Sequence, residues 1–135
     1  MKRLFLSILA GLLANIILAT AADHILHVTN VYPPYGQPMF NTGLVLLAFT
    51  YRALFIILCA YLTALIAKDK AGKALWILGI IGSVLWLIGA ISFWNYAPAW
   101  YNIGGVVLGV PLTLLGGALY KFRVNANQKM ILNGA

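Results

Sequence analysis

Asp23, His24 and His27 are the closest group of side chains in this chain that could form a proton or metal site. If a helix runs through them, Asp23 and His27 share a face at a spacing of four residues. Aspartate and histidine bind zinc or copper, but a catalytic zinc also needs a third protein ligand and an open position. We therefore expect neither a metal nor a cofactor. The histidines are interpreted either as polar caps of a helix end or as a pH-responsive group.

Arg52 lies within a long apolar segment. A charge inside a membrane costs at least about 2.5 kcal/mol on insertion scales and faces protein or water, so Arg52 requires a partner. Because helical side chains lean toward the helix N-terminus, its guanidinium should point toward the end where Asp23 lies. The other acidic residue, Asp69, belongs to the opposite end. We predict an ion pair between Asp23 and Arg52, joined by Asn15 and Tyr51.

This polar cluster has two interpretations. It is either a structural clamp between two helices, since a buried ion pair adds specificity more readily than stability, or a functional site. In the second case Arg52 carries the internal charge of an oligomeric carrier or channel for a small anion or a proton, with Asp23 and His27 as titrating partners.

The elements that must position these residues are membrane helices. Of the 135 residues, 63% are hydrophobic and 8% are charged, against about 25% charged in an ordinary soluble domain. A membrane-spanning helix needs about 20 apolar residues. The pattern predicts one all-α domain, residues 1–135, an antiparallel bundle of four transmembrane helices at 4–22, 43–67, 74–94 and 103–120. An external loop, 23–42, and a cytoplasmic tail, 121–135, complete it.

Positive charges predict the orientation, because Lys and Arg in short loops stay on the cytoplasmic side. Eight of the nine fall on one side of the four predicted helices, and the ninth is Arg52. Both termini should therefore be cytoplasmic, in a bacterial inner membrane. Aromatic residues populate the outer boundary: Tyr32, Tyr35, Trp94, Tyr96, Trp100 and Tyr101. One alternative stays open, since the first 21 residues also fit a cleaved signal peptide.

Small residues recur at helical spacing along the predicted spans and should allow close helix packing. The candidates are Gly11, Gly82, Gly89, Gly105, Gly109 and Gly117. Gly105 and Gly109 could instead mediate dimerisation, and membrane protein partners are a further alternative. Pro111 is expected to bend the last helix.

Motifs for proteolysis, lipid hydrolysis or phosphate binding are missing from the sequence, as is any Glu. The net charge of +7 is explained by topology, so we expect no nucleic-acid partner. The first interpretation is a non-enzymatic accessory or interaction subunit that presents an aromatic, Pro-rich outer face. The anion or proton carrier is the alternative.

The chain resembles a group of short bacterial membrane proteins in three strings that follow one another in this order: Asp23-His24-Ile25-Leu26-His27, Val31-Tyr32-Pro33-Pro34-Tyr35-Gly36-Gln37-Pro38-Met39 and Tyr51-Arg52. That group is uncharacterised, so the resemblance implies the four-helix architecture and no activity. The chain is also similar in size to small multidrug-resistance transporters, but it lacks the Glu of their first helix. Their activity is therefore not carried over.

Overall fold

The computed structural model describes residues 1–34 and 36–134, so Tyr35 lies outside the described residues. Within these residues the chain is helical, and the predicted all-α class is confirmed for them. The elements are α1 (Lys2–Val28), α2 (Thr42–Ala67), the 3-10 helix η1 (Lys68–Lys70), α3 (Ala71–Ser92), the 3-10 helix η2 (Trp94–Tyr96) and α4 (Ala99–Gly134).

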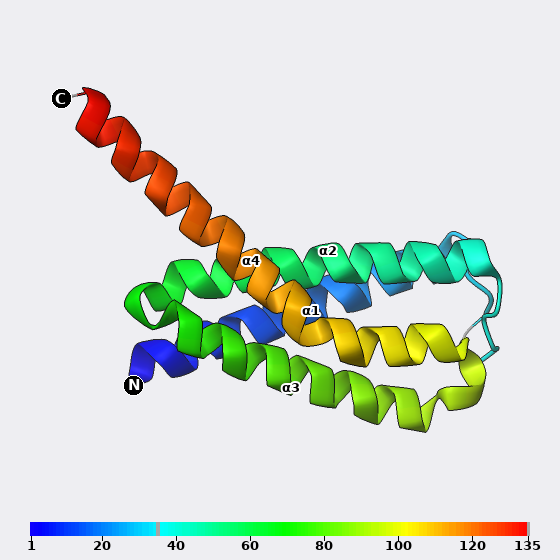
Figure 1. Cartoon of the computed structure of the whole chain (residues 1–135). Coiled ribbons are helices and arrows are strands. Elements are labelled where there is room, and N and C mark those ends of the chain that lie inside the picture. Colours follow the sequence, from blue (N-terminus) through cyan, green and yellow to red (C-terminus); the bar gives the residue numbers. More distant parts are fainter. Residues whose placement is uncertain (35, 135) are drawn as a thin grey trace.

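Three helical stretches are long and apolar enough to cross a membrane, namely Lys2–Val28, Thr42–Ser92 and Ala99–Gly134. The second stretch comprises α2, η1 and α3, which follow one another without a break. The chain reverses direction at η1, where Lys68 has a φ of 51°, and α3 returns alongside α2 (Figure 1). The fold is consistent with a membrane protein built as a helical bundle.

The two ends of the bundle differ in character. The N-terminus and η1 lie at one end, which we call the basic end, and the neighbouring Lys70 ammonium lowers the pKa of the N-terminal amine there (Figure 1). Residues 29–41 and η2 lie at the opposite end, which we call the loop end. There the Met39 N–H donates to the Tyr96 carbonyl oxygen at 2.7 Å, which ties the long loop to η2.

α1 is longer than the sequence pattern suggested. The predicted end of this helix before Asp23 is wrong, because the helix continues to Val28. A single Asp and two His do not break a helix, and the break comes instead at Asn30, whose φ is 60°. The loop therefore spans 29–41 rather than 23–42, and Asp23 projects from a regular helical turn.

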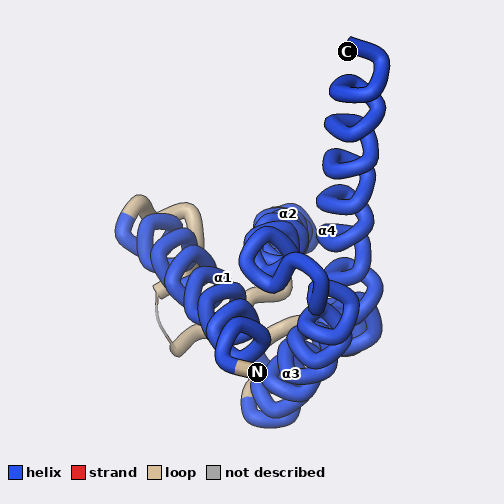
Figure 2. The backbone as a smooth tube through the Cα atoms, turned by 90° about the vertical axis from the view of Figure 1, so that its left-hand side faces the viewer, coloured by secondary structure: helices blue, strands red, loops and turns tan. Residues whose placement is uncertain are grey.

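α4 also exceeds its predicted span of 103–120. It continues as a helix to Gly134, so the expected tail is helical over nearly all of its length. Its C-terminal part leaves the bundle and its side chains there are largely exposed (Figures 1 and 2). Pro111 lies inside α4, which changes direction along its length, as expected from the missing N–H. α2 and α3 begin and end within three residues of the predicted spans, 43–67 and 74–94.

Large apolar side chains face outward and small or polar ones face inward. The exposed set includes Phe5, Ile17, Leu54 and Ile91, whereas Ser7, Thr63, Ala60 and Ala64 are fully buried. Toward the basic end, Ala60 and Ala64 of α2 pack against Leu75 of α3 in a small apolar cluster. This distribution is typical of helices that contact one another through small residues in an apolar surrounding.

Candidate functional site

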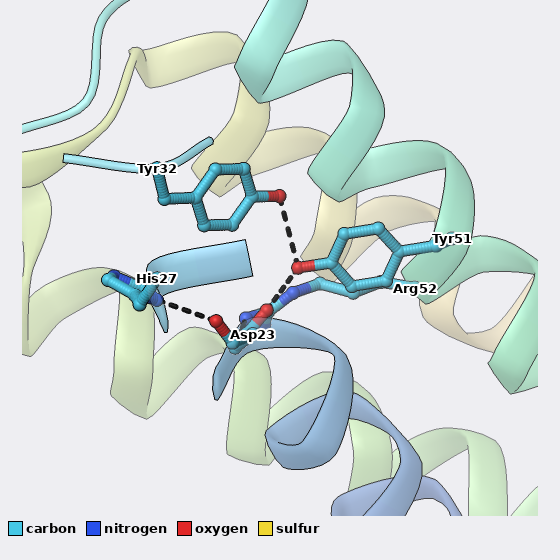
Figure 3. A network of polar contacts seen from close by, with 5 residues as sticks. All are labelled: Asp23, His27, Tyr32, Tyr51 and Arg52. Atoms are coloured by element: carbon cyan, nitrogen blue, oxygen red, sulfur yellow. Dashed lines mark hydrogen bonds and ion pairs between the residues drawn. The ribbon is translucent and has the colours of Figure 1, made fainter. Parts of the chain in front are cut away.

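Asp23 and Arg52 meet where α1 and α2 run side by side in opposite directions, near the loop end. Arg52 Nη2 donates to Asp23 Oδ2 in an ion pair (Figure 3). The two side chains remain 30% and 27% exposed, respectively. The structure therefore brings together the two residues that the sequence analysis paired, and it leaves each of them partly accessible.

Tyr51 and Tyr32 extend this pair toward the loop. The Tyr51 hydroxyl donates to Asp23 Oδ1, and the Tyr32 hydroxyl donates to the Tyr51 oxygen at 3.1 Å (Figure 3). Tyr51 was expected in the cluster, whereas Tyr32 had been assigned only to the membrane boundary. Tyr32 is buried because the N–H groups of residues 31 and 32 donate to the Leu26 carbonyl, folding the loop back onto the end of α1. Burial raises the pKa of the Tyr32 hydroxyl above its ordinary value.

His27 lies beside the pair and contacts the backbone of Asp23. Its Nδ1 is 2.7 Å from the main-chain carbonyl oxygen of Asp23, so this nitrogen carries the proton and donates it. The His27 ring also meets the Tyr32 ring edge-on, at 5.4 Å between centroids. His24 lies on an exposed part of α1. Within 1–34 and 36–134, no three His, Cys, Asp or Glu side chains are grouped to hold a metal ion.

Arg52 also contacts α3. The guanidinium carbon lies 5.8 Å from the centroid of the Trp86 ring, which is within the range of a cation–π interaction. Its Nε has no hydrogen-bond partner within the part of the chain that the structure describes. A single side chain from α2 thus joins α1 through Asp23 and α3 through Trp86.

Asp23 and Arg52 line two cavities. The larger, which we call the central cavity, has a volume of about 430 Å³ and lies between α1, α3 and the start of α4. The smaller, the loop cavity, has about 140 Å³ and is lined partly by the loop residues Pro33, Gln37 and Met39. Four residues line both of them: Asp23, Arg52, Ala97 and Tyr101.

A third cavity of about 60 Å³, the deep cavity, continues toward the basic end. It shares five lining residues with the central cavity: Leu12, Asn15, Ile56, Gly82 and Trp86. Asn15 therefore lines the same cavity as Arg52, which is where the structure places this expected member of the cluster.

Four of the six predicted packing glycines lie at close helix contacts. A Cβ atom at Gly11 would lie 1.9 Å from Thr63 Oγ1, and one at Gly105 would lie 1.8 Å from the Trp86 ring. Gly109 and Gly117 similarly contact the α3 side chains Ser83 and Leu75. Because this stripe of α4 is covered by α3, it serves internal packing and is not free for dimerisation.

The prediction that Gly82 and Gly89 are packing residues is wrong. A Cβ atom at either position would meet nothing within 4 Å, and both glycines line the central cavity. Small residues on a helix can either admit a neighbouring helix or leave space, and these two leave space. Gly116 was missed, although a Cβ there would lie 2.4 Å from the Ile57 carbonyl oxygen. The pattern that singled out Gly117 did not extend to its neighbour, which faces α2.

Comparisons of the chain with protein family models, with curated proteins and with solved structures gave no match. The resemblance to short bacterial membrane proteins therefore stays a prediction, and the function must be inferred from the site itself.

Proposed function

We propose that this chain is an integral protein of a bacterial inner membrane that crosses the bilayer four times. The continuous stretch of α2, η1 and α3 has 51 residues. At 1.5 Å per residue it would measure about 77 Å if it were straight, against a hydrocarbon core of about 30 Å. Because the chain reverses direction at η1, this stretch can cross the hydrocarbon core twice, which fits both its own length and the thickness of the core.

We propose further that both termini lie on the cytoplasmic side. The segments at the loop end, 29–41 and 93–98, contain no Lys or Arg. The basic end carries the N-terminal charges and those of the turn between α2 and α3, and α4 adds more after it leaves the bundle: Lys2, Arg3, Lys68, Lys70, Lys73, Lys121, Arg123 and Lys129. This asymmetry favours a cytoplasmic basic end.

Within this framework, the function that the geometry supports best is a non-enzymatic carrier for a small anion that binds at Arg52. The observation that carries the proposal is the succession of three cavities that share lining residues, with the ion pair lining both the loop cavity and the central cavity. A purely structural clamp does not need to line two cavities. Ionisable residues inside membrane bundles commonly mark such solute pathways.

The succession of cavities narrows toward the basic end. The deep cavity ends among Cys59, Leu78 and Thr113, and the packed cluster of Ala60, Ala64 and Leu75 follows in the next helical turns. A carrier must keep one side closed while the other is accessible, and small, closely packed residues on the closed side suit a part that separates and recloses.

The accessory-subunit interpretation rests on exposed aromatic side chains at the loop end, such as Phe40, Trp94 and Trp100. Aromatic residues at a bilayer boundary are exposed in the same way without binding a partner. These exposed side chains therefore do not favour an accessory subunit over the carrier.

The test is uptake of radiolabelled benzenesulfonate, a permanent anion, by proteoliposomes. The matched control is the double variant Asp23→Asn/Arg52→Gln, in which neutral side chains of similar size replace the pair. We expect saturable uptake by the wild type and none above protein-free liposomes by the folded double variant. Equal uptake by both proteins, or none by the wild type, contradicts the carrier.

A further inference from the structure

We infer that the anion bound at Arg52 is amphipathic, with one anionic head at the guanidinium and an elongated apolar body in the central cavity. This inference rests on the proposed function and specifies its substrate class. It follows from the balance of donors around Arg52, the lining of the central cavity and its length along the helices.

Hydrogen-bond donors exceed acceptors around the ion pair. Both carboxylate oxygens of Asp23 are already engaged, Oδ1 by Tyr51 and Oδ2 by Arg52. A guanidinium has five N–H donors, and the ion pair uses Nη2 only. Arg52 is 30% exposed and lines both cavities, so part of its side chain is accessible to a ligand, although Nε itself is buried. A ligand that accepts hydrogen bonds therefore fits better than one that donates them.

The same charges select an anion over a cation. Arg52 and Asp23 are the charged residues that line the central cavity. Asp23 is 27% exposed, but each of its oxygens already accepts a hydrogen bond, whereas the guanidinium keeps donors that the ion pair does not use. An incoming anion meets the guanidinium directly and competes with Asp23 for it, and planar guanidinium groups bind carboxylate, sulfonate and phosphate oxygens well.

The rest of the central cavity is mostly apolar. Its walls include side chains that offer no hydrogen bonds: Leu12, Ile16, Ala19, Ile56, Leu85, Ala90 and Phe93. Asn15, Thr20 and Asn102 add a few polar groups. A volume of about 430 Å³ lies within the roughly 300–1,000 Å³ range of ligand pockets, which are mainly apolar with a few placed polar groups.

The central cavity is also long. It is lined from Leu12 to Asp23 on α1 and from Gly82 to Phe93 on α3, which is a distance of roughly 16 Å along each helix at 1.5 Å per residue. Arg52 lies on its border with the loop cavity, toward the loop end. An extended alkyl chain with its head at Arg52 matches this shape, whereas a compact inorganic anion would leave most of the apolar wall uncovered.

The experiment measures binding of alkylsulfonates to the wild type in phosphatidylcholine nanodiscs by isothermal titration calorimetry. We expect dodecanesulfonate to bind at least about tenfold more tightly than methanesulfonate, because each buried methylene adds favourable transfer free energy. Dodecanol and dodecyltrimethylammonium, which have the same chain without the anionic head, should bind at least about tenfold more weakly than dodecanesulfonate.

Two glycine variants test whether the alkyl chain of the ligand lies in the central cavity. Gly89→Leu adds a side chain to the wall of the central cavity, at a position where a Cβ meets nothing within 4 Å. Gly72→Leu is the matched control, on the same helix, equally uncrowded and outside the cavity. We expect Gly89→Leu to weaken dodecanesulfonate binding at least tenfold and Gly72→Leu to leave it unchanged. Asp23→Asn removes the internal competitor and should strengthen binding.

The outcomes separate the substrate class from the carrier itself. If methanesulfonate and dodecanesulfonate bind equally tightly, and Arg52→Gln weakens the binding of both, the amphipathic class is wrong and the anion carrier stands. If Arg52→Gln weakens the binding of neither sulfonate, both proposals are wrong. Equal binding to Gly89→Leu and Gly72→Leu also overturns the inference. Addition of phosphatidylglycerol to the nanodiscs then shows where the natural ligand comes from. If this anionic lipid weakens dodecanesulfonate binding, the site holds a membrane lipid. If it does not, the site holds a free amphiphile.

Discussion

The carboxylate of Asp23 and the guanidinium of Arg52 form an ion pair between α1 and α2, and the same two residues line both the central and the loop cavity. Consecutive residues of α2, Tyr51 and Arg52, occupy the two oxygens of one carboxylate. The pair therefore connects the helices and borders the path of the proposed solute at the same time.

The ion pair predicts a non-additive effect on stability. Leaving a fully buried charge without its partner costs about 3–5 kcal/mol. Since both side chains are partly exposed, we expect Asp23→Asn and Arg52→Gln each to lower the free energy of unfolding by about 2 kcal/mol. The double variant should recover most of this loss. Thermal unfolding of all four proteins in the same detergent measures it, and simple addition of the two losses would show that the residues are not coupled.

Glycine substitutions should separate packing from cavity positions. Gly116→Ala places a methyl group 2.4 Å from the Ile57 main-chain oxygen and 2.7 Å from Ala60 Cβ, so α2 and α4 must move apart. We expect a loss of about 1–3 kcal/mol, the usual range for overpacking. Gly82→Ala adds the same methyl group to open space and should leave the melting temperature unchanged or higher. A Gly116→Ala protein as stable as Gly82→Ala would contradict the close contact of α2 and α4.

The raised pKa of Tyr32 predicts that the folded protein loses stability at alkaline pH. Burial raises the pKa of Tyr32 above its ordinary value of about 10. An unfolded chain then releases this proton at a lower pH than the folded protein does. The contribution of Tyr32 is fully present below pH 10 and is lost as the pH rises through its raised value. The melting temperature should fall less steeply above pH 10 in Tyr32→Phe than in the wild type or in Tyr120→Phe, and parallel slopes would contradict this role.

The proposed topology can be tested with single cysteines. Cys59 is the one cysteine of the chain, so Cys59→Ser provides a background for labelling. In intact cells or spheroplasts, an impermeant maleimide should label Gln37→Cys, in the loop between α1 and α2. Lys70→Cys, in η1, should react only after the membrane is opened. Labelling of both positions from outside would mean that the stretch from Thr42 to Ser92 does not cross twice.

The parts of the fold that the sequence predicted are those with strong physical constraints. The apolar spans follow from length and composition. The pairing of Asp23 with Arg52 followed from the scarcity of acidic residues. Arg52 is the charged residue inside a predicted span, Asp23 lies near it, and Asp69 lies at the opposite end. The structure brings these two residues together because few other arrangements would satisfy a charge in an apolar bundle.

The parts that the sequence did not predict depend on tertiary contacts. A polar composition does not distinguish a helical turn from a loop, so the extension of α1 to Val28 and that of α4 to Gly134 were missed. Helical spacing gave Gly82 of α3 and Gly105 of α4 the same packing role, but it does not say whether a neighbouring helix covers either face. Only the positions of α1 and α3 show that Gly82 borders a cavity and that Gly105 meets Trp86.

The central claim is that Arg52 and the central cavity together hold an anion, and locating one directly is its sharpest test. Crystals of the protein grown with para-bromobenzenesulfonate should give an anomalous bromine peak inside the central cavity, among residues such as Ile16, Leu85 and Gly89, with the sulfonate at the Arg52 guanidinium. A bromine peak found only at the lysine residues of the basic end, with the central cavity empty of the compound, would contradict the account.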